Sequence, residues 1–250
     1  MLFRYVHNWR DLGGHIATTG RAVRSNVLFR SAVLTPVGHE DLEQIAALGI
    51  RTTIDLRTAD ERAQFGGDPP FPARHMAMPL LDPDDLEATE KVPTLGEAYV
   101  QYLRRRRVGG RLVAVLRMVA DQGNLPVVLS CSAGKDRTGL VVATILASLG
   151  VPDDAIADDY AASDPHLDAL YASWALNPAS TIGERLRTSG HLLRAPREAM
   201  ETVLAEVRSE HGSMREYLAA HGADQGLFGQ LEHALLEDGF AREPRAAAMF

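Results

Sequence analysis

The sequence predicts an α/β domain with a helical cap or a C-terminal helical layer. In the first half of its 250 residues, short apolar runs typical of strands alternate with stretches of helical spacing. In the second half, helical spacing dominates. We find no internal repeat and no low-complexity linker, so we expect a single domain over residues 1–250.

The first half is expected to begin with two short strands between residues 15 and 30, joined at Thr19-Gly20. Thr35-Pro36 predicts the start of a helix, because threonine caps helices and proline suits the first turn. Gly49 is expected to end that helix. The following strands are expected over residues 50–56 and 73–80, with a loop at 66–70 between them.

The second half is expected to contain one strand and several helices. Helices are predicted over residues 95–106, 109–122 and 137–149, and a central strand over 125–129. Within residues 153–190, helical spacing places Leu167, Leu170, Tyr171 and Trp174 on one face. This segment is expected to be either a helical lid or ordinary core.

Composition excludes several classes of protein. Apolar residues make up 46% and charged residues 24%, and the formal net charge is −7, which disfavours a nucleic-acid binder. The longest apolar run, residues 140–151, is shorter than the roughly 20 residues that span a bilayer. No signal peptide is recognisable, and a lone cysteine cannot form an intrachain disulfide. We therefore expect a cytoplasmic protein, with signal-less export left open.

The lone cysteine begins the segment that carries chemistry. Residues 127–139 read as a strand, a short glycine-containing loop and the start of a helix. Such a loop directs backbone N–H groups and the positive end of the helix dipole at one point, where an anion fits. The same donors stabilise the thiolate of Cys131. Arg137 can bind two phosphoryl oxygens at once, so the pair suggests phosphoryl transfer to sulfur followed by hydrolysis.

Simpler explanations of these residues are less favoured. A lone cysteine is most often a small buried apolar residue, and the Cys-x5-Arg spacing alone arises by chance, but here it comes with Ala133-Gly134, Thr138-Gly139, a preceding strand and a following helix. A Walker-type nucleotide loop does not fit, because Asp136 follows Gly134-Lys135 where serine or threonine is required. Lys135 is one of only two lysines among 26 cationic residues, so its place beside the loop needs a reason.

Residues 131–139, Cys-Ser-Ala-Gly-Lys-Asp-Arg-Thr-Gly, resemble the signature loop of the protein tyrosine phosphatase superfamily, in particular the bacterial tyrosine and phosphoinositide phosphatases. The resemblance implies a central, mostly parallel sheet flanked by helices and extends over nearly the whole chain. Ser130 departs from the pattern, because the family usually has histidine there, which supports the loop and the thiolate. Further matching segments are Asn8–Gly14, Leu28–Ser31, Gly49–Arg57, Ala157–Tyr160 and Glu216–Leu218.

The resemblance implies a role for each residue of the loop. Cys131 would be the nucleophile and Arg137 the phosphate clamp, and Thr138 could donate a hydrogen bond to the sulfur. Lys135 is linked in the family to phosphoinositide headgroups and would reach a second phosphate; otherwise it is an exposed loop charge. The expected phosphate-binding residues are Ser132, Ala133, Gly134, Lys135, Asp136, Arg137 and Thr138.

The general acid has two candidates. Asp82 follows a predicted strand and resembles the family's acid position, although it also lies in a run of acidic residues typical of a solvated loop. Asp136 is the second candidate because it already lies on the loop. Residues Asp55, Arg57 and Glu61 are expected to form a structural ion-pair set beneath the site.

Arg104–Arg107 and Arg111 form a dense basic patch. It is either a solvated helix end or a docking surface for anionic lipid. The nine histidines show no metal-ligand spacing, so we expect neither a metal nor another cofactor.

The sequence therefore predicts a phosphatase that acts on phosphotyrosine proteins, with phosphoinositides as a second substrate class, through a phosphocysteine. The alternatives are a phosphatase of small metabolite esters and a catalytically weak or inactive phosphate-binding module. The oligomeric state is left open.

Overall fold

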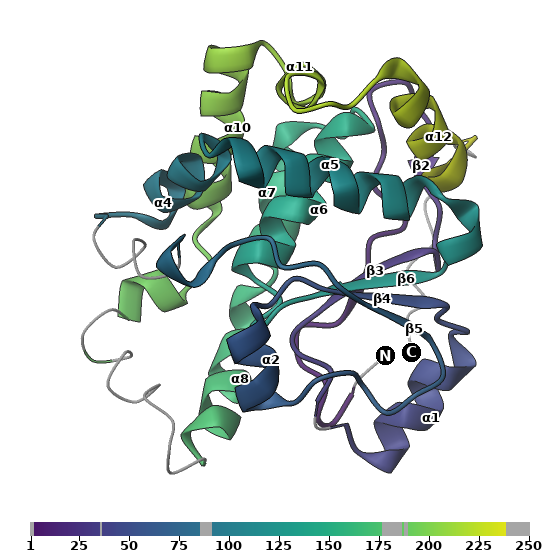
Figure 1. Ribbon diagram of the computed structural model, residues 1–250, viewed down its shortest axis with the longest axis vertical. Helices are drawn as coiled ribbons and strands as arrows, with labels where there is room; N and C mark the ends of the chain where they lie inside the picture. Colours follow the sequence, from purple (N-terminus) through teal and green to yellow (C-terminus); the bar gives the residue numbers. More distant parts are fainter. Residues whose placement is uncertain (1–2, 36, 86–91, 177–186, 188–189, 239–250) are drawn as a thin grey trace, which may run out of the picture.

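A five-stranded sheet forms the centre of the computed structural model (Figure 1), which describes residues 3–35, 37–85, 92–176, 187 and 190–238. At one edge of the sheet, β1 (Arg10–Asp11) and β3 (Leu28–Ser31) are antiparallel to each other. All other neighbouring strands are parallel. The predicted α/β fold with a mostly parallel sheet is confirmed. Across the sheet the strands are β1 (Arg10–Asp11), β3 (Leu28–Ser31), β6 (Val127–Ser130), β4 (Thr52–Asp55) and β5 (Arg74–Ala77).

Helices cover both faces of this sheet, because successive residues of a strand point to opposite faces and both sets are apolar. Val127 faces the larger core, which includes α5 (Arg106–Ala120) and α6 (Asp136–Ser148). Its neighbour Val128 faces a smaller core with α1 (His39–Ala47). Figure 1 shows α1 on one side of the sheet and α5 and α6 on the other.

A layer of further helices packs on the larger core, as the second half of the sequence predicts. Helix α10 packs against α4 and α7, and α12 packs against α5. A small ribbon pairs β2 with β7. The bounds of these and the remaining elements are β2 (Ala22–Val23), α4 (Leu95–Leu103), α7 (Asp153–Ala161), α8 (Asp164–Ala175), α10 (Arg197–His211), α11 (Met214–Ala219), α12 (Gln225–Leu235) and β7 (Leu236–Glu237), with 3-10 segments at Gln122–Asn124 and Gly190–Leu193.

Several elements differ from the sequence-based expectation, and the short strands β1 and β7 are not among the predicted elements. Helix α1 begins at His39 behind Gly38 rather than at Thr35-Pro36, of which Pro36 lies outside the described residues. Helix α2 (Ala59–Phe65) is not among the predicted elements. It begins with a capping box, in which the Thr58 hydroxyl accepts from the backbone of Glu61 and the Glu61 carboxylate accepts from the backbone of Thr58.

The segment expected as a lid contributes α7 and α8, whereas residues 177–186 and 188–189 lie outside the described part. Leu167, Leu170 and Tyr171 are buried, as their spacing predicts. Helix α8 lies beside α2 (Figure 1), and Trp174 stacks on Phe65 with ring centroids 6.5 Å apart.

Candidate active site

The only cysteine of the chain lies at the carboxyl end of β6. Cys131 follows the last strand residue directly, a short loop runs to Lys135, and α6 begins at Asp136. The parallel neighbours β3 and β4 end in register with Ser130, at the same edge of the sheet. The structure therefore contains the strand, loop and helix that the sequence predicts, at the sheet edge where α/β proteins bind ligands.

Gly134 shows how tightly the loop packs on this edge. Its φ is +65°, a conformation that favours glycine. A Cβ at this position would lie 2.4 Å from the carbonyl carbon and oxygen of Ser31. Any larger residue would push the loop away from β3.

Arg137 lies in the first turn of α6, and the carboxylate of Glu61 binds its guanidinium from one side. Its two terminal nitrogens donate to Glu61 at 2.5 and 2.7 Å, and one of them donates to the Ser132 hydroxyl at 3.2 Å. The Ser132 hydroxyl in turn donates to Glu61 at 2.7 Å. Glu61 thus fixes the plane of the guanidinium and ties it to the beginning of the loop.

The charges of this pair support each other. Burial alone would raise the pKa of Glu61, but the hydrogen bonds and charge of Arg137, with help from Ser132, lower it to about 2. Burial alone would lower the pKa of Arg137, and the Glu61 carboxylate with the charge of Cys131 raises it instead. Both groups are therefore ionised at neutral pH.

Two buried donors at the start of α6 have no acceptor among the described residues. They are Nε of Arg137 and the hydroxyl of Thr138. Buried donors without partners are rare in folded proteins. An anion bound in the loop would supply the acceptor that such donors need.

Glu61 is the residue of this site whose role the sequence analysis missed. The expected ion-pair set forms between Asp55 and Arg57, with Nη2 of Arg57 2.7 Å from the Asp55 carboxylate, and Arg62 completes it. Glu61 lies outside that set and binds Arg137, because α2 follows β4, the strand beside β6. The sequence signal that could have identified Glu61 is its capping-box spacing from Thr58, because this spacing predicts the start of a helix at this edge of the sheet.

Asp82 lies on the loop after β5 and is held by arginines of α5. Its carboxylate is 2.7 Å from Arg111 and 2.8 Å from Arg107. The hydrogen bond from Arg111, with the nearby charges of Arg107 and Arg105, holds the pKa of Asp82 below its ordinary value. In this arrangement the side chain is an ionised ion-pair partner.

Most arginines of the basic patch pair with neighbouring carboxylates. Arg105 and Arg107 both bind the fully buried carboxylate of Asp85. Arg104 pairs with Glu206 and Glu210 of α10. The patch is thus largely neutralised by neighbouring carboxylates, which argues against a free cationic surface.

Asp136, the second candidate acid, is the first residue of α6, directly after the loop. Its carboxylate accepts a hydrogen bond of 2.5 Å from the hydroxyl of Tyr99, which is 2.9 Å from the hydroxyl of Tyr160. Burial, with the charge of Asp136 as the next cause, raises the pKa of both tyrosines, so both are neutral donors. The Asp136 side chain is 35% exposed and reaches solvent at the loop.

Lys135 is buried, with 1% of its side chain exposed, so it is not an exposed loop charge. Its ammonium donates to the carbonyls of Leu192 and Arg194 at 2.7 and 2.9 Å and lies 3.2 Å from Asp136. Two hydrogen bonds and an ion pair therefore hold the ammonium in place. Contact with a second phosphate would require Lys135 to leave the segment at Leu192–Arg194.

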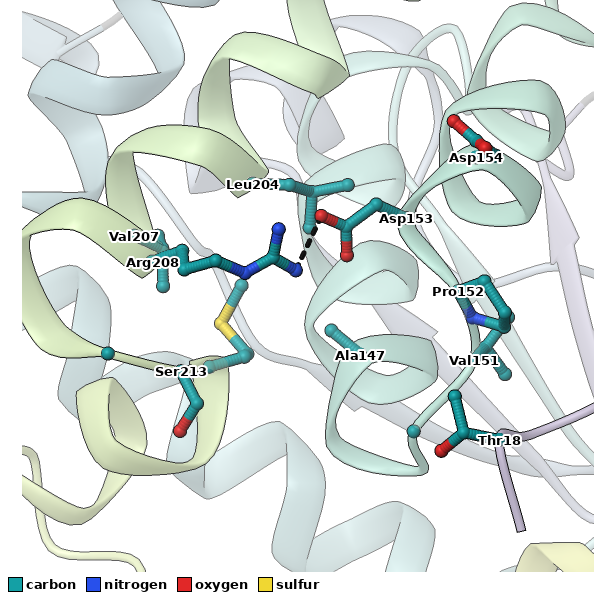
Figure 2. Close-up of a pocket in the computed structure, with 13 residues that line it drawn as sticks. Thr18, Ala147, Val151, Pro152, Asp153, Asp154, Leu204, Val207, Arg208 and Ser213 are labelled. Carbon is teal, nitrogen blue, oxygen red and sulfur yellow. Dashed lines mark ion pairs between the residues drawn. The ribbon is translucent and has the colours of Figure 1, made fainter.

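An open cavity of about 570 Å³ lies away from this loop, at the far end of α6 (Figure 2). Gly150 and Met214 contribute to its walls, and an ion pair of 2.6 Å between Arg208 and Asp153 lies across it. None of residues 131–137 lines this cavity.

Neither a metal cluster nor a membrane-spanning helix is found in the described part of the chain. Within the described ranges, no group of three or more histidine, cysteine, aspartate or glutamate residues is placed to hold a metal ion. No helix in that part of the chain is both long and apolar enough to cross a membrane.

Comparisons with known proteins find a matching family model and several relatives. A sequence model described as "Tyrosine phosphatase family" matches residues 1–237. The chain is 31% identical to a tyrosine-protein phosphatase of Nostoc commune, over 89% of this chain and 79% of that protein. It is 27% identical to the triple specificity protein phosphatase PtpB of Mycobacterium tuberculosis, over 92% and 96%. The crystal structure of P. aeruginosa TpbA aligns with a TM-score of 0.39 and 18% identity, over 81% of this chain and 91% of that one.

Proposed function

Because this chain belongs to the tyrosine phosphatase family, we propose that it hydrolyses phosphotyrosine and phosphoinositide monoesters through a phosphocysteine on Cys131. The observation that carries the proposal is the loop after β6. It places the only cysteine at the end of a strand and the arginine fork of Arg137, aligned by Glu61, at the start of the following helix.

The reaction takes two steps at one phosphorus atom. In the first, the Cys131 thiolate attacks phosphorus and the bond to the ester oxygen breaks, while that oxygen receives a proton from a general acid. In the second, water attacks phosphorus, the sulfur–phosphorus bond breaks, and the same group takes the proton of the water. Arg137 and the loop amides bind the phosphoryl oxygens in both steps.

We assign the general acid to Asp136 rather than Asp82. Both carboxylates have partners that favour the ionised form, since two arginines bind Asp82, and Lys135 and the Tyr99 hydroxyl bind Asp136. The assignment therefore rests on position, because Asp136 lies beside Arg137 in the first turn of α6 and its side chain reaches solvent there. Asp82 could serve only after release from Arg107 and Arg111.

Substitution of each aspartate by asparagine separates the two candidates. Asp136→Asn is expected to change kcat/KM for nitrophenyl phosphate little, because nitrophenolate leaves without a proton in the first step. It should slow phosphotyrosine, whose phenol has a free pKa of about 10, and slow alkyl phosphates most. Asp82→Asn should behave as a surface change. Values of kcat/KM, which report the steps up to release of the leaving group, are measured for the three esters and for each variant across pH.

The opposite assignment gives an opposite pattern. If the graded loss follows Asp82→Asn instead, Asp136 is not the acid. An equal loss of kcat/KM for all three leaving groups in Asp136→Asn would indicate damaged binding and would also contradict the assignment.

The breadth of substrate is tested directly by a panel of esters. The proposal predicts turnover of phosphotyrosine peptide and of phosphoinositide in vesicles, with less for phosphoserine peptide. A relative named for triple specificity supports a broad range. Turnover confined to a small metabolite ester would support the alternative phosphatase. Phosphate binding without any turnover would identify an inactive binding module. Ser130, which stands where the family usually has a histidine that supports the thiolate, is the feature in favour of this alternative.

A further inference from the structure

The carbonyl groups of the phosphate loop need hydrogen-bond donors from outside the loop. In a trans peptide the C=O and the following N–H point in opposite directions. If the amides of the loop point at a phosphate, the carbonyls before them point outward into the protein. There, buried carbonyls require partners.

Three successive carbonyls of this loop have such partners. The backbone N–H of Val33 donates to Ser132 at 3.1 Å. The side-chain amide of Asn8 donates to Ala133 at 2.9 Å, and the guanidinium of Arg30 donates to Gly134 at 2.7 Å. Two of the three contacts are therefore made by side chains.

Both side chains are buried and belong to one network. Asn8 is 1% exposed and Arg30 is fully buried. Arg30 also binds the carboxylate of Asp159 in α7, and Arg10 binds the same carboxylate at 3.3 Å and the side-chain oxygen of Asn8. The hydroxyl of Ser163 accepts from Arg10 and Arg30 at 3.2 and 3.4 Å.

The network gathers segments that lie far apart in the sequence and that the phosphatase mechanism alone does not explain. Asn8 and Arg10 come from the first segment singled out by the resemblance, Arg30 from the second, and Asp159 from α7. Two arginines share one carboxylate, so the network carries a surplus positive charge beneath the loop. Burial, and the charge of Arg30, lower the pKa of Arg10 only to about 10, so Arg10 is charged at neutral pH.

We propose that Asn8 and Arg30 are positioning residues for phosphate binding, which hold the carbonyls of Ala133 and Gly134 outward so that the loop amides face the phosphate. Asp159 holds Arg30 and Arg10 in place and thereby connects the loop to α7. The inference rests on the proposed function, since it concerns the same loop.

Asn8→Asp separates positioning from simple support of the fold. Asn8 has φ of +56°, which aspartate also tolerates. One oxygen of the new carboxylate still accepts from Arg10, and its charge is balanced by the surplus charge of the network. The other oxygen replaces the amide that donates to Ala133, so the carbonyl loses its donor and faces a negative charge.

A matched control is available at another buried asparagine. Asn124 is 4% exposed, and its side-chain amide donates to the carbonyl of Met118 at 2.9 Å. Asn124 lies in the segment before β6, so it is at the opposite end of that strand from the loop. Asn124→Asp therefore makes the same chemical change at a backbone carbonyl without touching the phosphate loop.

The measurement is the inhibition constant of inorganic phosphate against an aryl phosphate, together with the melting temperature of each full-length variant. Asn8→Asp is expected to raise the inhibition constant about tenfold or more, because a buried acceptor loses its donor. Asn124→Asp is expected to leave it unchanged, whatever its effect on melting temperature. Arg30→Lys, which keeps the charge but loses the planar fork, is expected to raise it as well.

An unchanged inhibition constant in folded Asn8→Asp overturns the inference. Should Asn8→Asp not fold, an unchanged constant in Arg30→Lys overturns it. Loss of phosphate affinity in Asn124→Asp equal to that in Asn8→Asp would also overturn it, because the effect would then follow stability. A wild-type protein that neither turns over aryl phosphate nor binds phosphate would instead contradict the proposed function.

Discussion

Cys131→Ser is expected to abolish hydrolysis of every phosphate ester and to preserve phosphate binding. The serine hydroxyl stays protonated at neutral pH and is a far weaker nucleophile than a thiolate. The loop amides, Arg137 and its partner Glu61 are unchanged by the substitution. We expect turnover to fall by at least about a thousandfold, on the scale known for loss of a catalytic nucleophile.

Two readouts on the same sample check this expectation. Initial rates with an aryl phosphate give the loss of turnover, and titration with inorganic phosphate gives the affinity. Appreciable remaining turnover in Cys131→Ser would exclude a covalent mechanism through this residue. Loss of phosphate affinity would show that the sulfur itself is part of the anion site.

Arg137→Lys has the second largest expected effect. Lysine keeps the positive charge but replaces a planar fork by a single ammonium, so it cannot hold Glu61 and phosphate in fixed planes together. The Nε donor of Arg137, which has no acceptor among the described residues, is lost as well. We expect kcat/KM to fall by about 100- to 1,000-fold, as for removal of one donor to a transition-state oxyanion.

For Arg137→Lys, kcat and KM must be measured separately to show which of them carries the loss. Because the fork is proposed to bind the phosphoryl group most tightly in the transition state, most of the loss should appear in kcat. Arg62→Lys is a useful control, since Arg62 pairs with Asp55 and Asp68 and not with the loop. Near-normal constants in Arg137→Lys would remove the clamp from the mechanism.

The sequence predicts the strand, loop and helix around Cys131 well because the information for them is local. A strand, a cysteine, a glycine and an arginine stand within a few residues of one another, and each has a clear conformational or chemical preference. The helix ending at Gly49 is predictable for the same reason, since its φ of +63° suits glycine. The mostly parallel sheet follows from the resemblance and the alternation of elements.

What the sequence does not predict depends on contacts between distant segments. Glu61 reaches Arg137 only because β4 and β6 are neighbours in the sheet, an order that no local pattern specifies. Asp82 looks like an available acid in the sequence, yet α5 presents two arginines to it. Lys135 stands in a loop of small and polar residues, and its burial results from the segment at Leu192–Arg194 that folds over it.

Detection of phosphate on Cys131 distinguishes a covalent phosphocysteine mechanism from every non-covalent one. Wild type, Asp136→Asn and Asp82→Asn are mixed with nitrophenyl phosphate, quenched in acid, and digested for mass spectrometry. Nitrophenolate leaves without an acid, while hydrolysis of the intermediate still needs a base, so the phosphoenzyme should accumulate in Asp136→Asn. We expect a phosphate on the peptide that contains Cys131. Active turnover with that peptide unmodified in all three proteins would contradict it.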